Sequence, residues 1–216
     1  MLAKYLISGV DRSRDAFMTQ LFEDVAWSDV VWIRSHNKDQ LSPEDLSRFT
    51  IKPNTMTRGQ VSCTIKHFLA LHHFVTAAEG EVALIMEDNV TFPTKFPSVI
   101  EDYLRSHLRW DLVFEGDTMP VPWYGRFLAA RADAPAPLFK KYRGRSRASQ
   151  GATNAANAYL IRRPAAERAI GEFLPFDQVV DFHWNDLIRR LKLNTYWPLY
   201  PVVHRIRRRS TLQYDD

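Results

Sequence analysis

Three consecutive oxygen-bearing side chains, Glu87, Asp88 and Asn89, follow the most hydrophobic run of the sequence, Val82 to Met86. Ligands of open α/β sheets bind beyond the carboxyl ends of the strands, so this position suits a binding site. Carboxylate and amide oxygens are the ligands that Mg²⁺ and Mn²⁺ prefer, and such cations are commonly shared with substrate phosphates. We therefore predict that these three residues bind a divalent metal and a diphosphate. The alternative is a polar turn that only ends the strand.

A second acidic pair, Glu115 and Asp117, follows another apolar run, Asp111 to Phe114. The pair is a rival metal site, because it could line the same crevice. We rank it lower, since Pro120 and Pro122 indicate a loop that leaves the sheet. The alternative here is a solvated turn.

Apolar runs that predict strands alternate with segments of helical spacing. The predicted strands are 4–9, 30–34, 82–86, 111–114, 158–161 and, as an edge strand, 195–199. The predicted helices carry Phe17 to Phe22, begin after Ser42, run from Gly59 to Gly80, carry Ile100 to Leu108, and cover 164–172 and 181–191. This alternation predicts one α/β domain, residues 1–216, with a mixed, mostly parallel sheet and helices on both faces. No period is sustained over 116–151, where we expect a mobile loop on the substrate side.

The composition is that of a globular protein. The chain has 216 residues, with 29 Lys and Arg against 25 Asp and Glu, a net charge of +4. The single cysteine, Cys63, excludes a disulfide framework and a thiolate zinc cluster and is expected to pack in the core. Positive charge gathers at 140–147 and in a basic C-terminal tail, 204–216, and such clusters attract phosphates. The run Arg207 to Arg209 has neither interleaved aromatics nor a groove-reading element, so no nucleic-acid partner is expected, and a nucleic-acid-binding protein is the less favoured alternative.

Several blocks occur in the order and spacing of a known family. Arg58 to His67 reads Arg-Gly-Gln-Val-Ser-Cys-Thr-Ile-Lys-His, and the other blocks are Tyr5 to Ile7, Asp11 to Arg14, Val82 to Asn89, Trp110 to Val113, Ala158 to Ile161 and Val179 to Asp181. Together they resemble glycosyltransferase family 25, the lipopolysaccharide-biosynthesis type. Its members carry Gly-Glu-Ile-Gly-Cys-x₂-Ser-His and Ile-Leu-Glu-Asp-Asp at the matching places. The resemblance implies a GT-A-like domain with a Rossmann-like nucleotide-binding half.

The resemblance also implies an activity. It is transfer of a hexose from a nucleotide-diphosphate sugar, with a UDP-sugar as the first expectation, to a hydroxyl of a glycan or glycolipid acceptor with inversion, aided by Mn²⁺ or Mg²⁺. The base would be Asp181, with Asp177 in reserve because it lies one turn earlier if that segment is helical. The remaining expected site residues are Ser8, Arg12, Arg14 and His67 with Glu87, Asp88 and Asn89 for the donor, and Trp123 and Tyr124 for the acceptor.

Three departures from the family pattern change these expectations. Gln60 replaces Glu, Lys66 replaces Ser, and Asn89 replaces the last Asp of Glu-Asp-Asp. An amide oxygen ligates without charge, so metal dependence is expected to be weak or absent, and Asp88 becomes the first choice of ligand. A catalytically inactive nucleotide-sugar-binding protein with the same fold is the alternative.

Two further points stay open at this stage. A buried structural role for His67 is as strong as a donor-binding role. The resemblance also implies lipid-linked glycan acceptors, and with the C-terminal arginines this gives the expectation of a cytoplasmic protein in peripheral contact with the anionic inner face of a membrane.

Overall fold

The computed structural model describes residues 1–52, 55–116, 138–140, 156–198 and 201–206. Its centre is a seven-stranded sheet in the order β2-β1-β3-β7-β5-β8-β6. The strands are β1 (Leu2–Ile7), β2 (Val30–Ile33), β3 (Val82–Glu87), β5 (Leu112–Phe114), β6 (Leu138–Lys140), β7 (Ala158–Arg162) and β8 (Thr195–Pro198). A separate antiparallel pair joins β4 (Val90–Thr91) to β9 (His204–Arg205).

The sheet is mixed and mostly parallel, as the sequence predicts. Strand β1 pairs in parallel with both β2 and β3, and β5 pairs in parallel with β8. Strand β7 is antiparallel to both β3 and β5, and β6 is antiparallel to β8. Five strands therefore point in one direction and bring their carboxyl ends to one edge of the sheet.

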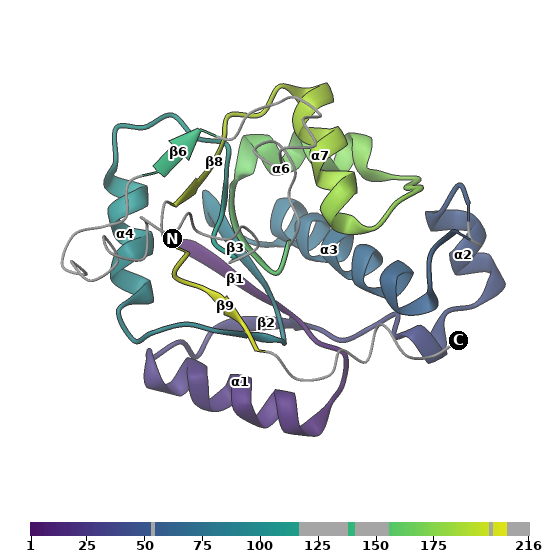
Figure 1. The fold of residues 1–216 in the computed structure, drawn as a ribbon, viewed down its shortest axis with the longest axis horizontal. Coiled ribbons are helices and arrows are strands. Elements are labelled where there is room, and N and C mark those ends of the chain that lie inside the picture. The colour runs from purple at the N-terminus through teal and green to yellow at the C-terminus, as the bar shows by residue number, and fades with distance from the viewer. Residues whose placement is uncertain (53–54, 117–137, 141–155, 199–200, 207–216) are drawn as a thin grey trace, which may run out of the picture.

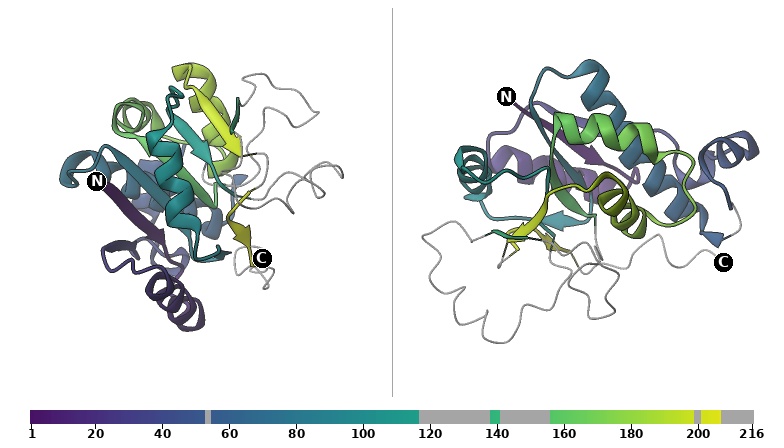
Figure 2. Two further views of the ribbon diagram at one scale, coloured as in Figure 1. Left: turned by 90° about the vertical axis from the view of Figure 1, so that its left-hand side faces the viewer. Right: turned by 90° about the horizontal axis from the view of Figure 1, so that it is seen from above.

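Helices cover both faces of this sheet (Figure 1, Figure 2). They are α1 (Arg12–Asp24), the 3₁₀ helix η1 (Lys38–Gln40), α2 (Pro43–Phe49), α3 (Arg58–Ala77), α4 (Phe96–Arg105), α6 (Arg163–Phe173) and α7 (Val180–Leu191). Apolar side chains of α1 and α4 form one buried cluster with one face of the strands, and those of α3, α6 and α7 form the other. In β3, Leu84 joins the first cluster and Ile85 the second, so this unalternating strand is covered on both sides, as predicted.

Local signals in the sequence explain where two helices begin. Ser42 accepts a hydrogen bond from the backbone N–H of Asp45, and the Asp45 carboxylate accepts one from the N–H of Ser42. Thr57 and Gln60 exchange the same pair of bonds at the start of α3. Glutamine serves this reciprocal cap as well as glutamate does, so the Gln60 departure leaves the start of α3 intact.

The carboxyl ends of β1 and β3 form a topological switch point. From β1 the chain passes through α1 to β2 on one side, and later returns through α3 to β3 on the other side. Connections that leave in opposite directions open a crevice between two strand ends, and α/β proteins bind ligands there. The ladder continues to this point, since Ile7 pairs with Glu87 and the Asp88 N–H donates to the Ile7 carbonyl at 3.0 Å.

The far side of the sheet differs from the prediction. Strand β8 was expected at the edge, but β6 pairs outside it, with Leu138 opposite Pro198. Strand β6 lies inside the aperiodic segment 116–151, and a strand of three residues is too short to show the alternation that predicts a strand. The rest of that segment beyond Gly116 lies outside the described residues. The start of the expected basic tail, His204 and Arg205, forms strand β9. None of the described helices is long and apolar enough to cross a membrane.

Candidate functional site

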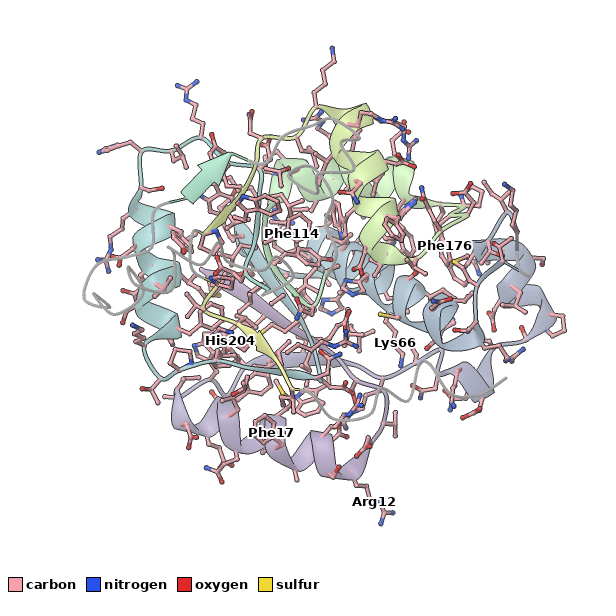
Figure 3. The ribbon with its side chains drawn as sticks, viewed as in Figure 1. Arg12, Phe17, Lys66, Phe114, Phe176 and His204 are labelled. Atoms are coloured by element: carbon pink, nitrogen blue, oxygen red, sulfur yellow. The ribbon has the colours of Figure 1, made fainter. Side chains whose placement is uncertain are left out.

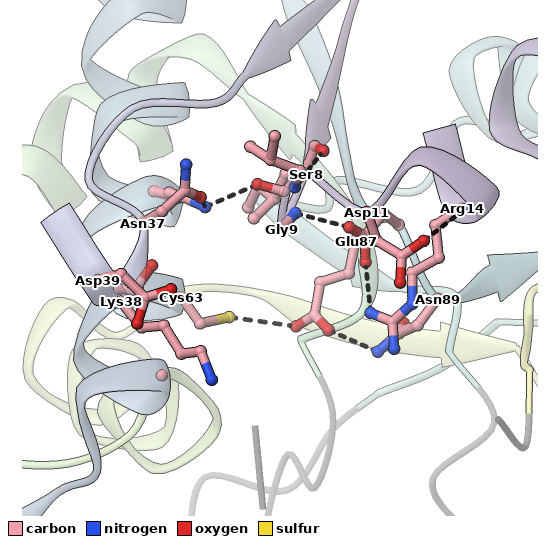
Figure 4. Close-up of a pocket in the computed structure, with 16 residues that line it drawn as sticks. Ser8, Gly9, Asp11, Arg14, Asn37, Lys38, Asp39, Cys63, Glu87 and Asn89 are labelled. Carbon is pink, nitrogen blue, oxygen red and sulfur yellow. Dashed lines mark hydrogen bonds and ion pairs between the residues drawn. The ribbon is translucent and has the colours of Figure 1, made fainter. Parts of the chain in front are cut away.

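A pocket of about 290 Å³ lies at the switch point between β1 and β3 (Figure 4). Its walls come from the end of β1, from the segment after β2, from the first turns of α3 and from the end of β3. The lining residues are 7–11, Arg14, 37–39, Gly59, Ser62, Cys63, Lys66 and 87–89. The pocket therefore brings together Ser8, Arg14 and the predicted triplet after β3.

Asp88 shapes the pocket through bonds within the protein. Its Oδ2 accepts a hydrogen bond from the Gly9 N–H at 2.6 Å, and its Oδ1 accepts one from Arg14 at 3.0 Å. Burial raises the pKa of Asp88, and the bonds from Gly9 and Arg14 oppose that effect only in part. Both carboxylate oxygens thus hold the loop between β1 and α1, and the role of Asp88 as the first metal ligand remains a prediction.

Glu87 stands at the centre of the polar contacts. Its Oε1 lies 3.5 Å from His67 Nε2 and 3.6 Å from Cys63 Sγ, and its Oε2 accepts a hydrogen bond from the Asn89 amide at 3.1 Å. Burial raises the pKa of Glu87, but the bond and charge of His67, the charge of Arg205 and the Asn89 bond outweigh it, and the pKa is lowered. The carboxylate is therefore an anion at neutral pH.

The side-chain oxygen of Asn89 has no hydrogen-bond partner among the described residues. The side-chain nitrogen donates to Glu87, whereas Oδ1 is buried and accepts no hydrogen bond from that part of the chain. The backbone carbonyl of Asn89 accepts from the Ile206 N–H at 2.7 Å, so the strand β9 runs beside the pocket rim. This contact brings Arg205, from the basic cluster, into electrostatic reach of Glu87.

His67 lies behind the pocket wall rather than in it. The ring is fully buried, stacks on Tyr159 at a centroid distance of 5.6 Å, and its Nδ1 is 3.0 Å from the Tyr159 hydroxyl. Its Nε2 faces Glu87. Of the two roles left open by the sequence, the burial favours positioning of Glu87 over direct contact with a donor.

Asp181 lies in the first turn of α7, within electrostatic range of Glu87 and His67. Its Oδ1 accepts a hydrogen bond from the Ala156 N–H at 2.7 Å. Burial, and then the negative charge of Glu87, raise the pKa of Asp181 to about 6. Asp177 does not share this environment: α7 begins only at Val180, so the helical register assumed for the pair is absent, and Asp177 is exposed.

The other predicted residues divide by location. Ser8 is buried at the pocket, where its hydroxyl donates to Asp15 at 2.8 Å. Arg12 is exposed on α1 and extends outward, and it does not line the pocket (Figure 3). Trp123 and Tyr124 lie outside the described residues.

Lys66 is a pocket residue that the sequence analysis did not assign to the site. It is 3% exposed, and its ammonium donates to the Ser8 carbonyl at 2.6 Å and to the Asn37 side chain. Burial lowers its pKa. The ammonium group therefore connects the loop after β1 to the segment after β2. The replacement of the family serine by Lys66 was the sequence signal that could have identified this residue.

Cys63 packs against the core, as expected, and it also lines the pocket. Burial and the charge of Glu87 raise the pKa of its thiol. Val10, also in the lining, has a φ of 63° and is 51% exposed. A β-branched residue in this region of the backbone map is strained, and such strain gathers at ligand-binding loops.

The rival acid, Glu115, occupies a different place. It is fully buried, and neither carboxylate oxygen has a hydrogen-bond partner within the ranges that the structure describes. Burial raises the pKa of Glu115 to about 8, and burial followed by the charge of Glu115 raises the pKa of Tyr103 in α4. Glu115 therefore faces the α4 side and does not line the pocket, contrary to the expectation of a shared crevice. Asp117 lies outside the described residues.

Comparison with known proteins gives a family and weak structural likenesses. A comparison with curated proteins finds no match. Among solved structures, A197 from STIV has a TM-score of 0.44 at 12% identity, covering 94% of this chain and 83% of that one. The inositol-1-phosphate CTP transferase from T. maritima has a TM-score of 0.43 at 10% identity, with 95% and 69% covered. Mouse xyloside xylosyltransferase 1 in its apo form has a TM-score of 0.35 at 11% identity, with 90% and 78% covered. At these TM-scores, the likenesses support no conclusion about the function of this chain.

The family profile is decisive. The profile described as glycosyltransferase family 25 (LPS biosynthesis protein) matches residues 4–184, which include most of β1, the pocket, β3 and the Asp181 turn. The chain belongs to glycosyltransferase family 25.

Proposed function

We propose that this glycosyltransferase transfers a hexose from a nucleotide-diphosphate sugar to a glycan hydroxyl with inversion, and that the donor binds in the switch-point pocket. The observation that supports this most is the position of Glu87, Asp88 and Asn89, which end β3 where β1 and β3 diverge. A UDP-sugar remains the first expectation for the donor, and a glycan or glycolipid for the acceptor.

The pocket has two ends of different character. The nucleoside end would lie between Ser8 to Asp11 and Asn37 to Asp39, where Val10 offers an exposed apolar surface to a base. The diphosphate end would lie near Glu87 and Asn89. Arg14 and Lys38 in the lining and Arg205 beside it supply positive charge for the phosphates.

The oxygen ligands at the end of β3 fit a divalent cation that is weakly held. Glu87 supplies an anionic carboxylate, and the buried, unpartnered Oδ1 of Asn89 supplies a neutral oxygen ligand. Asp88 would join them only by sharing an oxygen that already accepts a hydrogen bond. A bound Mn²⁺ or Mg²⁺ would neutralise charge on the departing diphosphate.

Asp181 is the proposed base. The acceptor oxygen forms its bond to the anomeric carbon, the bond from that carbon to the diphosphate oxygen breaks, and the acceptor proton passes to the Asp181 carboxylate. A single displacement of this kind inverts the anomeric configuration. With a pKa of about 6, the group is mostly ionised at neutral pH and is more basic than an ordinary aspartate. The exposed Asp177 is the reserve candidate.

An inactive donor-binding protein is the second candidate, and two observations favour it. The last position of the acidic triplet is the uncharged Asn89, and both oxygens of Asp88 are engaged within the chain. Such a protein would bind nucleotide sugars in the same pocket and release no nucleotide.

The test is a panel of nucleotide sugars assayed for nucleotide release with glycan acceptors, with and without Mn²⁺. The variants are Asp88→Ala and Asp181→Asn, and Asp177→Asn decides between the two candidate bases. We expect release by the wild type and by Asp177→Asn, and strong loss in the other two variants. Binding without release under every condition would favour the inactive protein instead.

A further inference from the structure

Three side chains of different chemistry converge at one edge of the pocket. The Sγ of Cys63, the Nε2 of His67 and a carboxylate oxygen of Glu87 all lie within 4.8 Å of one another. Oε1 of Glu87 is 3.6 Å from the sulfur and 3.5 Å from the nitrogen. Figure 4 shows Cys63 directed from α3 toward Glu87.

Regular structure fixes this arrangement. Cys63 and His67 are four residues apart in α3, so their side chains lie on one face of the helix. Glu87 is the last residue of β3, which packs beside that helix and is paired on both sides. The three ligand atoms therefore come from rigid elements rather than from a loop, as a preorganised site requires.

The environment of the His67 imidazole indicates a metal ligand. His67 is fully buried, and within the described part of the chain its Nε2 makes no hydrogen bond of ordinary geometry; the Glu87 carboxylate oxygen lies 3.5 Å away. A buried polar atom that is so weakly partnered is destabilised, so this nitrogen is available to a ligand. The other ring nitrogen is bonded to the Tyr159 hydroxyl, which fixes the ring so that Nε2 points at Glu87. Metal-binding histidines are oriented in the same way by a second partner.

The distances agree with a tetrahedral centre. With bonds of ~2.3 Å to sulfur and ~2.0 Å to nitrogen or oxygen, tetrahedral angles place neighbouring ligand atoms roughly 3.3–3.6 Å apart. The two distances from Glu87 Oε1 fall in this range. One sulfur, one imidazole nitrogen and one carboxylate oxygen are a softer set than Mg²⁺ or Mn²⁺ prefers, and they suit Zn²⁺.

We propose that Cys63, His67 and Glu87 bind Zn²⁺ or a similar transition metal, at a site that shares Glu87 with the proposed diphosphate cation site and differs from it in its thiolate and imidazole ligands. Two of the ligands, Cys63 and Glu87, line the pocket, so the ion enters from there and its fourth position opens toward the bound substrates. Sites with three protein ligands and an open position are those in which zinc acts on a substrate or water oxygen. Binding of this metal does not depend on the proposed nucleotide-sugar donor, because all three protein ligands come from the chain itself.

The experiment exploits the single cysteine of the chain. The full-length protein is stripped with a chelator, loaded with Co²⁺, and examined by absorption spectroscopy; zinc content after loading and dialysis is measured by mass spectrometry. We expect one tightly held zinc per chain and, with cobalt, a thiolate-to-metal charge-transfer band together with the visible bands of a tetrahedral centre. Because Cys63 is the only thiol, that band can come from no other residue.

Variants assign the other ligands. His67→Gln and Cys63→Ser should each abolish the charge-transfer band and lower zinc affinity by at least about tenfold. His72→Gln, an exposed histidine on the same helix, is the matched control and should leave both unchanged. No charge-transfer band in the folded wild-type protein, or zinc affinity unchanged in both ligand variants, would overturn the proposal. These measurements use no nucleotide sugar, so their failure is distinct from a failure of the transferase assay.

Discussion

Strand β3 ends in a glutamate, Glu87, and strand β5 is followed directly by another, Glu115, and the two acids have different environments. Glu87 lies beside a pocket as an anion, supported by His67, Asn89 and Arg205. The Glu115 carboxyl group is buried and has no hydrogen-bond partner in the described part of the chain, and its pKa of about 8 keeps it mostly neutral at pH 7. The same residue type after an apolar strand thus becomes either a binding group or an internal acid, according to what surrounds the strand end.

Sheet topology explains the difference. Beyond β3 the chain meets a switch point, where the neighbouring strand β1 and its following helix diverge and leave space. Strand β5 lies between β7 and β8, and backbone pairing continues past its end. The Glu115 N–H donates to the Ala158 carbonyl, and the Val203 N–H donates to the Glu115 carbonyl. The segments that contain Ala158 and Val203 therefore cover Glu115, whereas a cavity opens beside Glu87.

The largest expected effect concerns catalysis near the β3 end. Asp181→Asn removes the proposed proton acceptor, so kcat should fall by about 10²–10⁴-fold while nucleotide affinity changes little. For the wild type, kcat should decline as the pH falls through about 6, because the carboxyl group with that pKa becomes protonated and cannot accept a proton. Glu115→Gln should leave the kcat and its pH profile unchanged. An equal loss of kcat in both variants would contradict the difference in function between the β3 and β5 ends.

The second effect concerns donor affinity. Asp88→Ala leaves the Gly9 N–H and Arg14 without their carboxylate, and the loop between β1 and α1 loses its anchor. Bonds to charged groups contribute ~1.5–3 kcal/mol, so nucleotide affinity should weaken by roughly 10- to 100-fold in titration calorimetry. The matched Glu115→Ala should not change that affinity once its folding is confirmed by circular dichroism. Unaltered binding in Asp88→Ala would show that the loop does not form the nucleoside end.

The third effect is on stability and belongs to Glu115. Its folded pKa of about 8 exceeds the ordinary value of 4.5, so between these pH values the folded protein binds more protons than the unfolded chain. The free energy of unfolding should therefore fall as the pH rises through this window, by at most ~1.4 kcal/mol per pH unit from this group. Glu115→Gln, which stays neutral, should remove that part of the slope in urea denaturation at pH 5 to 8.5. A slope that is the same in both proteins would contradict the assignment of a neutral, buried acid.

The smallest effect concerns the strained residue at the pocket. Val10→Gly relieves a φ of 63°, and the release is worth about 1 kcal/mol against the greater freedom of glycine in the unfolded chain. We expect a melting temperature that is unchanged or a few degrees higher, together with weaker nucleotide binding because the exposed apolar surface is lost. Tighter nucleotide binding in this variant would contradict a role for Val10 against the base.

Local sequence patterns predicted those parts of the fold that depend on neighbouring residues. The unalternating run of β3, the Ser42 cap and the spacing of α3 identify their elements without tertiary information. The place of Glu87 to Asn89 at the pocket also followed, because it depends only on a buried strand ending at a switch point. The family profile confirmed the glycosyltransferase resemblance.

Other features depend on contacts between distant segments. Glu115 and Glu87 look alike in sequence, and only the pairing of Glu115 with residues 158 and 203 distinguishes them. The convergence of Cys63 and His67 on Glu87 needs the packing of α3 beside β3, and Lys66 reaches Ser8 and Asn37 across three segments. Strand β6 is too short to show a period, so β8 was wrongly placed at the edge.

The position of the nucleotide diphosphate is the central claim. Its most direct test is a crystal structure of the full chain with UDP and Mn²⁺. The account predicts a uridine between the loop after β1 and the segment after β2, with the diphosphate and cation against Glu87 and Asn89. Ligand density at any other place, with the switch-point pocket holding only solvent, would contradict it.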